Sequence, residues 1–152
     1  MNFKKYSKVA VGGTFDKFHD GHKKLLSTAF EIGEKVEIGV TSDAFGGLKG
    51  NIDSCEERIG NLNSFFSDKR NFVVLPLDDP YGHTISDSEF DAIVVSEETE
   101  PTAVEINKIR TSKGMDPIDI VVVSFVLAYD GTPISSTRIR SGEINQKGDV
   151  LY

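Results

Sequence analysis

The chain has 152 residues, of which 38% are hydrophobic and 27% are charged, so its composition predicts one globular domain with a real core rather than a disordered chain. The formal net charge of −7 argues against nucleic acid as the main partner, because binding the phosphate backbone favours a basic face. Cys55 is the only cysteine, so no internal disulfide can form and a reducing compartment is favoured. With neither a signal peptide nor a long apolar stretch, we expect a cytoplasmic protein without a membrane partner.

Residues 9–22 combine a strand, a glycine pair and the start of a helix. Residues 9–11 are apolar and predict a buried strand, which the glycines at 12–13 are expected to end, letting a ligand approach the backbone. A helix is expected over residues 20–32, because apolar side chains recur there at helical spacing: Leu25, Leu26, Ala29 and Phe30. His19 and His22 therefore lie at a strand-to-helix junction, where unpaired N–H groups and two side-chain donors can bind a phosphate chain.

Other interpretations of this stretch remain open. A Gly-Gly pair is commonly a turn, and two histidines three residues apart can bind a metal. No cysteine or third histidine stands nearby to complete a metal site, however. The stretch also matches neither the G-x-G-x-x-G pattern nor a P-loop that ends in lysine.

The rest of the chain alternates between strand and helix patterns. Further strands are expected at residues 35–41, 71–77, 92–95 and 118–126, and further helices begin near Ser54, over residues 98–113 and at residues 135–137. Gly33 and Gly114 are the expected helix ends. Arg58, on the second helix, is either a surface residue or a loop anchor, and we favour the structural role. The alternation predicts an α/β protein: a three-layer α/β/α, Rossmann-like fold around a mainly five-stranded parallel sheet.

Polar segments follow the predicted strands at the ends where such folds bind ligands. These segments are residues 14–22, 41–43, the loop after residue 77, 96–99 and 135–140. The Gly-rich loop at residues 44–53 is either an ordinary surface loop or a lid that brings the Lys49 ammonium to a phosphate. Asp78 and Asp79 suit acid–base chemistry or Mg²⁺, but turn and cap chemistry beside Pro80 explains them equally well.

Two motifs carry a resemblance to a known superfamily. Residues 12–16, followed by His19-x-Gly21-His22, resemble the nucleotidyltransferases with a His-x-Gly-His motif, and residues 134–140 resemble their second motif. Residues 41–43, 76–82 and 90–96 are similar to one family within it, the archaeal-type phosphopantetheine adenylyltransferases. The resemblance covers residues 7–148, so residues 1–152 are expected to form a single nucleotidyltransferase domain.

The resemblance implies transfer of AMP from ATP to 4′-phosphopantetheine, which gives dephospho-coenzyme A and pyrophosphate in coenzyme A biosynthesis. The implied catalytic residues are His19, His22 and Lys49. The implied ATP contacts are Gly12, Gly13, Thr14, Phe15, His22, Ser135, Ser136, Thr137 and Arg140. The implied contacts to the second substrate are Thr14, Asp16, Lys49, Asp79 and Arg110. Mg²⁺ is expected to arrive with ATP, held by phosphates and water rather than by a protein cage.

The roles implied for the arginines on the third and last predicted helices leave alternatives open. Arg110 matches a substrate arginine of the family, although a solvated helix face also explains it. Arg138 and Arg140 are two residues apart and face different sides of the last helix, so only one of them is expected to contact the triphosphate.

The implied reaction needs no general base, since a phosphate monoester with a second pKa of about 6 is already anionic at neutral pH. The protein has to align two anions and stabilise charge at the α-phosphate and on the leaving group. The rival functions are another small nucleotidyltransferase, such as a cytidylyltransferase or a nicotinamide-mononucleotide adenylyltransferase, and a non-catalytic nucleotide-binding module. The sequence departs from the family pattern at Lys17-Phe18 and at Glu97, which adds negative charge near an anion site. The oligomeric state does not follow from the sequence.

Overall fold

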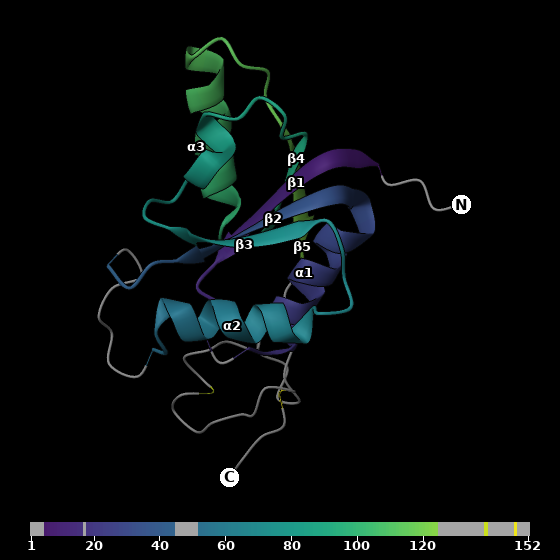
Figure 1. The fold of residues 1–152 in the computed structure, drawn as a ribbon. Coiled ribbons are helices and arrows are strands. Elements are labelled where there is room, and N and C mark those ends of the chain that lie inside the picture. The colour runs from purple at the N-terminus through teal and green to yellow at the C-terminus, as the bar shows by residue number, and fades with distance from the viewer. Residues whose placement is uncertain (1–4, 17, 45–51, 125–138, 140–147, 149–152) are drawn as a thin grey trace.

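The computed structural model describes residues 5–16, 18–44, 52–124, 139 and 148. Along these residues strands and helices alternate, as Figure 1 shows. The elements are β1 (Tyr6–Gly13), α1 (Asp20–Ile32), β2 (Gly33–Thr41), α2 (Cys55–Phe65), β3 (Phe72–Leu77), the 3₁₀ turn η1 (Gly82–Ile85), β4 (Ala92–Ser96), α3 (Glu100–Ser112) and β5 (Asp119–Val123). Within these ranges no helix has the length and apolar character needed to cross a bilayer.

The five strands form one parallel sheet in the order β3-β2-β1-β4-β5, which confirms the predicted α/β fold. From β1 the chain winds outward to β2 and β3, and it then returns to place β4 on the other side of β1. Val11 accordingly lies between Ile38 of β2 and Val94 of β4. In open parallel sheets ligands bind outside the carboxyl ends of the strands, at the point where the winding reverses. Here that point is the end of β1.

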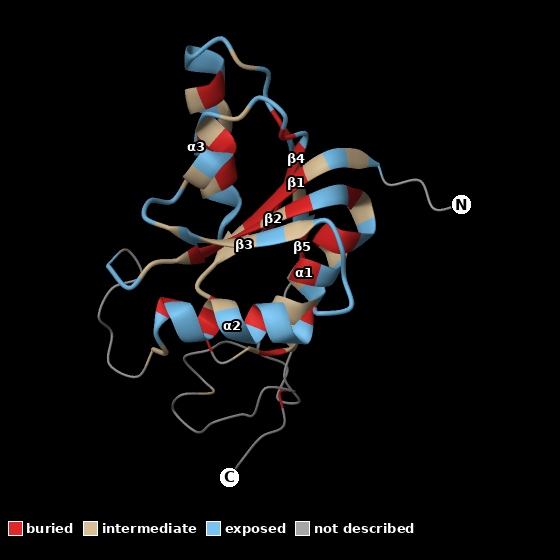
Figure 2. Cartoon of the chain, in the orientation of Figure 1, coloured by how far each residue is buried: buried red, intermediate tan, exposed pale blue. Residues whose placement is uncertain are grey.

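Helices cover both faces of the sheet, with α1 and α2 on one side and α3 on the other (Figure 1). Val9 and Val11 of β1 pack with α1 and α2, whereas Ala10, between them, packs with α3. The same alternation holds in β4, because successive strand residues point to opposite faces. Figure 2 shows the resulting buried stripe along β1 and β4. Burial on both faces explains why the sequences of these strands are continuous apolar runs.

One glycine expectation needs correction. Gly12 and Gly13 do not end β1, because they pair with Gly39 and Val40 of β2 and extend the strand by two residues. Gly33 is the C-cap residue of α1, as predicted, and its N–H bonds the last turn of the helix. Its φ of −112° is extended rather than left-handed, and it is also the first residue of β2. Gly114 does close α3 with a φ of 78°, as predicted.

The side chain of Leu77 covers the glycines near the carboxyl ends of β1 and β2. A Cβ atom built on Gly39 would lie 2.6 Å from Leu77 Cγ, and one built on Gly12 would lie 3.2 Å from Leu77 Cδ1. A Cβ on Gly82 would also meet Leu77, at 2.6 Å. Three glycines therefore leave the space into which one leucine packs.

Candidate active site

The two motif histidines close the amino end of α1 with a reciprocal cap. His19 is the N-cap residue, and its Nδ1 accepts hydrogen bonds from the N–H groups of Gly21 (3.0 Å) and His22 (3.3 Å). In return, Nδ1 of His22 accepts the N–H of His19 at 3.3 Å, which completes a capping box built from two histidines. The expectation that unpaired N–H groups bind an anion here is therefore wrong for Gly21 and His22.

The cap also fixes which ring nitrogens carry protons. Because each Nδ1 accepts a hydrogen bond, the proton of each neutral imidazole lies on Nε2. The rings stack with centroids 3.6 Å apart. Burial lowers the pKa of His19 to about 4, against the opposing charge of Asp20. Burial lowers the pKa of His22 to about 3, assisted by the neighbouring His19. Near neutral pH the pair therefore presents two uncharged Nε2–H donors.

Two phenylalanines complete the surroundings of His22. Phe18 stacks on its ring at 5.7 Å between centroids, and Phe15 meets it edge-on at 5.2 Å. Phe15 is 3% exposed, and its φ of 54° is left-handed, a conformation that costs a bulky residue about 1–3 kcal/mol. Its ring also lies against Gly13, where an added Cβ would be 3.2 Å away. The Phe15 side chain therefore belongs to the core, and the contact with ATP implied for this residue stays a prediction.

Gly21 has a specific steric role between the two histidines. A Cβ atom at this position would lie 2.8 Å from Cε1 and 3.0 Å from Nδ1 of His19. Real Cβ atoms essentially never approach this closely, so the glycine leaves room for the capping ring.

Thr14 and Asp16 follow β1, but their surroundings differ. Thr14 is partly exposed, and its hydroxyl accepts a hydrogen bond from the hydroxyl of Thr41, at the end of β2, at 3.3 Å. Asp16 is 1% exposed, and its carboxylate accepts the N–H of Asp53 at 3.0 Å. Thr14 thus lies where a ligand can reach it, whereas Asp16, expected to contact substrate, is buried in a contact within the protein.

Asp79 shapes a turn. Its carboxylate accepts the N–H groups of Tyr81 and Gly82, each at 2.8 Å. This is the turn chemistry that the sequence left open as the alternative to a substrate contact.

The structure speaks against the substrate role expected for Arg110. Its guanidinium is 1% exposed and donates to the carbonyl oxygens of Asp116 (2.7 Å), Thr84 (2.6 Å) and Asp87 (3.1 Å). The Asp87 carboxylate is bonded to Lys8 in the first half of β1, so Arg110 lies near the amino ends of the strands. The alternative of a solvated helix face is also wrong, because the side chain is buried.

The structure brings together Gly12, Gly13, Thr14, His19 and His22 around the carboxyl end of β1 and the start of α1. The other expected donors lie outside the described residues: Lys49, Ser135, Ser136, Thr137, Arg138 and Arg140.

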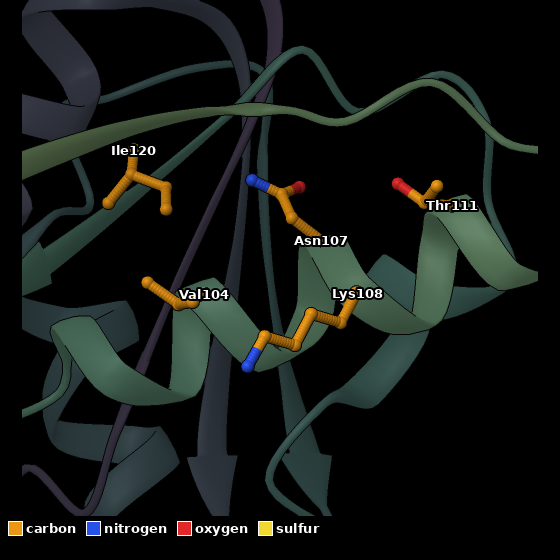
Figure 3. A pocket seen from close by; sticks show the side chains of 5 residues that line it. All are labelled: Val104, Asn107, Lys108, Thr111 and Ile120. Atoms are coloured by element: carbon orange, nitrogen blue, oxygen red, sulfur yellow. The ribbon is translucent and has the colours of Figure 1, made fainter.

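An open hollow of about 450 Å³ lies between α3 and β5 (Figure 3), and it is lined by Val104, Asn107, Lys108, Thr111 and Ile120. The Asn107 side chain bonds both backbone groups of Ile118, which joins the helix to the start of β5. Ile120 pairs with Ile93, the second residue of β4. The hollow therefore lies beside the first residues of these strands, away from the histidines.

Comparison with known proteins identifies the family of this chain. The sequence model of the cytidylyltransferase-like family matches residues 10–142. A phosphopantetheine adenylyltransferase of Methanothermobacter thermautotrophicus is 55% identical over 150 residues, which cover 97% of this chain and 92% of that protein. The chain belongs to the phosphopantetheine adenylyltransferase family. The two motifs of the sequence predict the nucleotidyltransferase superfamily, residues 41–43, 76–82 and 90–96 predict this family within it, and the comparison confirms both predictions.

A second named relative and a solved structure are also similar to this chain. The phosphopantetheine adenylyltransferase of Methanopyrus kandleri is 49% identical over 93% of each chain. A solved structure of a protein of unknown function from Archaeoglobus fulgidus has a TM-score of 0.71 and 36% identity, covering 76% of this chain and 88% of that one. The chain thus shares its sequence with named phosphopantetheine adenylyltransferases and its fold with the Archaeoglobus fulgidus structure.

Proposed function

We propose that this protein catalyses the reaction of ATP with 4′-phosphopantetheine to give dephospho-coenzyme A and pyrophosphate. Relatives named for this activity match nearly the whole chain. The observation that supports the chemistry most directly is the stacked pair His19 and His22, whose Nε2–H groups remain as donors at the carboxyl end of β1. That end lies at the reversal point of a parallel sheet, where phosphate-containing ligands bind in such folds.

In the proposed step, a phosphate oxygen of phosphopantetheine bonds to the α-phosphorus of ATP. The bond from that phosphorus to the bridging oxygen breaks, and its electron pair leaves with pyrophosphate. The nucleophile is already anionic, so the histidines act as hydrogen-bond donors rather than as bases. Neutral donors suit this role because they stay protonated on Nε2 without titrating near pH 7.

The remaining donors in the proposal come from three parts of the chain. Thr14 contributes a hydroxyl beside the end of β2, where it meets Thr41. The family resemblance assigns Lys49 to the phosphates of both substrates, and Ser136 and Arg140 to the triphosphate. Together they would hold the two anions in line for attack, which is the main source of acceleration in phosphoryl and nucleotidyl transfer.

Mg²⁺ forms part of the proposal as a companion of ATP, neutralising charge on the phosphates. The described residues contain no group of three or more His, Cys, Asp or Glu side chains placed to hold a metal ion. We assign the ion to phosphate oxygens and water, because Mg²⁺ bound with a nucleotide usually keeps such ligands. The proposal also places the reaction in the cytoplasm, where its ATP is available.

A pyrophosphate-release assay with matched donors and acceptors tests this function. ATP with 4′-phosphopantetheine should turn over, whereas CTP with the same acceptor, or ATP with nicotinamide mononucleotide, should not. Turnover with CTP would identify a cytidylyltransferase, and turnover with the mononucleotide would identify the other adenylyltransferase. Nucleotide binding without any pyrophosphate would instead identify a non-catalytic binding module.

A His22→Ala protein provides the internal control. Loss of one transition-state donor should lower kcat by about 10²–10³ while the protein stays folded by circular dichroism. A wild-type kcat in this variant would contradict the donor role.

A further inference from the structure

Arg58 joins three segments of the chain beneath the candidate site. Its side chain is 1% exposed and extends from the first turn of α2. Nη1 donates to the carbonyl oxygens of Thr14 (2.9 Å) and Thr41 (2.8 Å), and Nε donates to the carbonyl oxygen of Asp53 (2.8 Å). Nη2 lies 3.4 Å from a carboxylate oxygen of Asp43. One guanidinium thus links the ends of β1 and β2 to the start of α2.

These contacts hold the loop that leads from β1 to the histidines at two points. Thr14 is held directly, through its carbonyl oxygen. Asp16 is held indirectly, because its carboxylate accepts the N–H of Asp53, whose carbonyl oxygen in turn accepts from Arg58. Three residues further along, His19 caps α1. The position of Arg58 therefore constrains both Thr14 and the approach to the capping pair.

The same guanidinium also holds both flanks of the segment that includes Lys49. Asp43 precedes this segment and Asp53 follows it. Asp43 is fixed from a second side as well, since its carboxylate accepts the N–H of Cys55 at 2.8 Å. Arg58 is thus the one described side chain that bonds directly to Thr14, Asp43 and Asp53.

Only arginine fits these acceptors. Its planar group has donors that point in several fixed directions, whereas a lysine ammonium is a compact group that cannot reach all three segments at once. The hydroxyl of Thr41 adds a further link, because it accepts from Nη1 at 3.1 Å and donates to the Thr14 hydroxyl at 3.3 Å. Arg58 therefore holds separate backbone segments at fixed positions relative to one another.

We propose that Arg58 is a positioning residue for adenylyl transfer, holding Thr14 and the flanks of the Lys49 segment in one fixed arrangement. The inference rests on the proposed function and adds to it a residue that touches neither substrate. Its contribution should appear in kcat, since misplacing donors by about 1 Å can cost on the order of 10² in rate.

The test compares Arg58→Lys with Arg70→Lys, a matched change at an exposed position on the turn after α2. Steady-state rates are measured with ATP and 4′-phosphopantetheine at a temperature where circular dichroism shows each variant fully folded. Arg58→Lys should lower kcat about tenfold or more and change KM much less, whereas Arg70→Lys should match wild type. A folded Arg58→Lys protein with wild-type kcat and only a lower Tm would overturn the proposal.

Amide hydrogen exchange gives a readout that does not depend on turnover. The N–H groups of Asp53 and Cys55 should exchange faster in Arg58→Lys. Asp53 loses the bond from Arg58 to its carbonyl oxygen, and the Asp43 carboxylate, which accepts the Cys55 N–H, loses its bond to Nη2. The N–H groups that join β1 to β2 should exchange as in wild type. Unchanged exchange at Asp53 and Cys55 would also overturn the proposal.

Should Arg58→Lys fail to fold, Thr41→Val decides the question. This variant keeps the backbone carbonyl and the branched shape but removes the hydroxyl that links Arg58 to Thr14. A reduced kcat at wild-type Tm supports the proposal, and an unchanged kcat overturns it. An inactive wild-type protein would instead refute the proposed function, so the two failures are distinguishable.

Discussion

In each motif histidine, one ring nitrogen caps the helix and the other carries a proton that it can donate. Nδ1 of His19 and Nδ1 of His22 cap the helix, and the two Nε2–H groups remain for a ligand. An aspartate N-cap would satisfy the helix equally well but would leave no donor behind, because an ionised carboxylate only accepts hydrogen bonds. The His-x-Gly-His pattern is therefore a helix cap that also leaves two Nε2–H groups as hydrogen-bond donors.

The first prediction concerns pH. The folded-state pKa values of about 4 for His19 and about 3 for His22 lie below the ordinary value of 6.5, so both rings should stay neutral from pH 8 down to pH 5. Below pH 6.5 these histidines bind protons more readily in the unfolded chain than in the folded one, which favours unfolding. The stability due to these rings is thus fully present above pH 6.5 and falls as the pH drops towards the folded pKa values.

Ring signals followed by NMR between pH 5 and 8 test this prediction. The Cε1–H resonances of His19 and His22 should stay constant, and the nitrogen shifts should report protonated Nε2. A midpoint near 6.5 for either ring would show that the capping pair is not buried as described.

The second prediction concerns Gly21. Gly21→Ala should push the His19 ring from its capping position, because the new Cβ would lie 2.8 Å from Cε1. We expect kcat to fall about tenfold or more, as donors are displaced, and Tm to fall by a few degrees, as the helix loses its cap.

Gly60→Ala, in the middle of α2, is the matched control. An added Cβ there has no atom within 4 Å, so this change should stabilise the helix by about 0.5–1 kcal/mol without altering kcat. Equal activity in the Gly21 and Gly60 variants would contradict the steric role assigned to Gly21.

At the scale of the elements, the third prediction concerns the packing between β2 and β3. Gly39→Ala should lower the free energy of unfolding by about 1–3 kcal/mol, because its Cβ would overlap Leu77. In a Leu77→Ala background the same change should cost less than about 1 kcal/mol. Urea unfolding of the two single variants and the double variant measures this coupling. Additive effects would show that Leu77 does not fill the space above Gly39.

The sequence predicts the order and type of the described elements well, since hydrophobic period and capping are local signals. The third strand was expected at residues 71–77 and is found at Phe72–Leu77, and Ser54 caps α2 as expected. The end of β1 was missed, because Gly12 and Gly13 are held in the strand by pairing with β2, which local sequence does not contain.

The site was less predictable, because burial of polar residues depends on distant partners. Arg58 and Arg110 both continue buried helix stripes, with Cys55 and Leu62 in one helix and Ala103 and Ile106 in the other. This spacing of three and four residues was a readable sign that both arginines point inward. Asp16 carried no such sign, since its partner Asp53 is distant in the chain.

At the scale of the whole molecule, the fourth prediction concerns the order of events in catalysis. Direct attack requires both substrates to be bound together at the carboxyl edge of the sheet. Initial-rate plots at several concentrations of the second substrate should therefore intersect, and enzyme with ATP alone should release no stoichiometric burst of pyrophosphate. Parallel lines together with such a burst would indicate a covalent enzyme intermediate.

Cys55 is the residue to check for a covalent route. Burial raises the pKa of its thiol, and Sγ lies 3.8 Å from the carbonyl oxygen of Val40, so it is not poised as a nucleophile. A folded Cys55→Ser protein should keep its activity, and loss of turnover would count against direct transfer.

The central position of β1 has a consequence for how the protein is made. Its register with β2 forms from neighbouring sequence, but its other edge pairs with β4, where Val9 lies opposite Ala92. A ribosome therefore releases the strand that carries the histidine loop long before the partner that closes its far side. Until β4 emerges, that edge of β1 exposes unpaired backbone groups that another chain can pair with. The strand that leads into the histidine loop therefore has one unpaired edge until β4 has been synthesised.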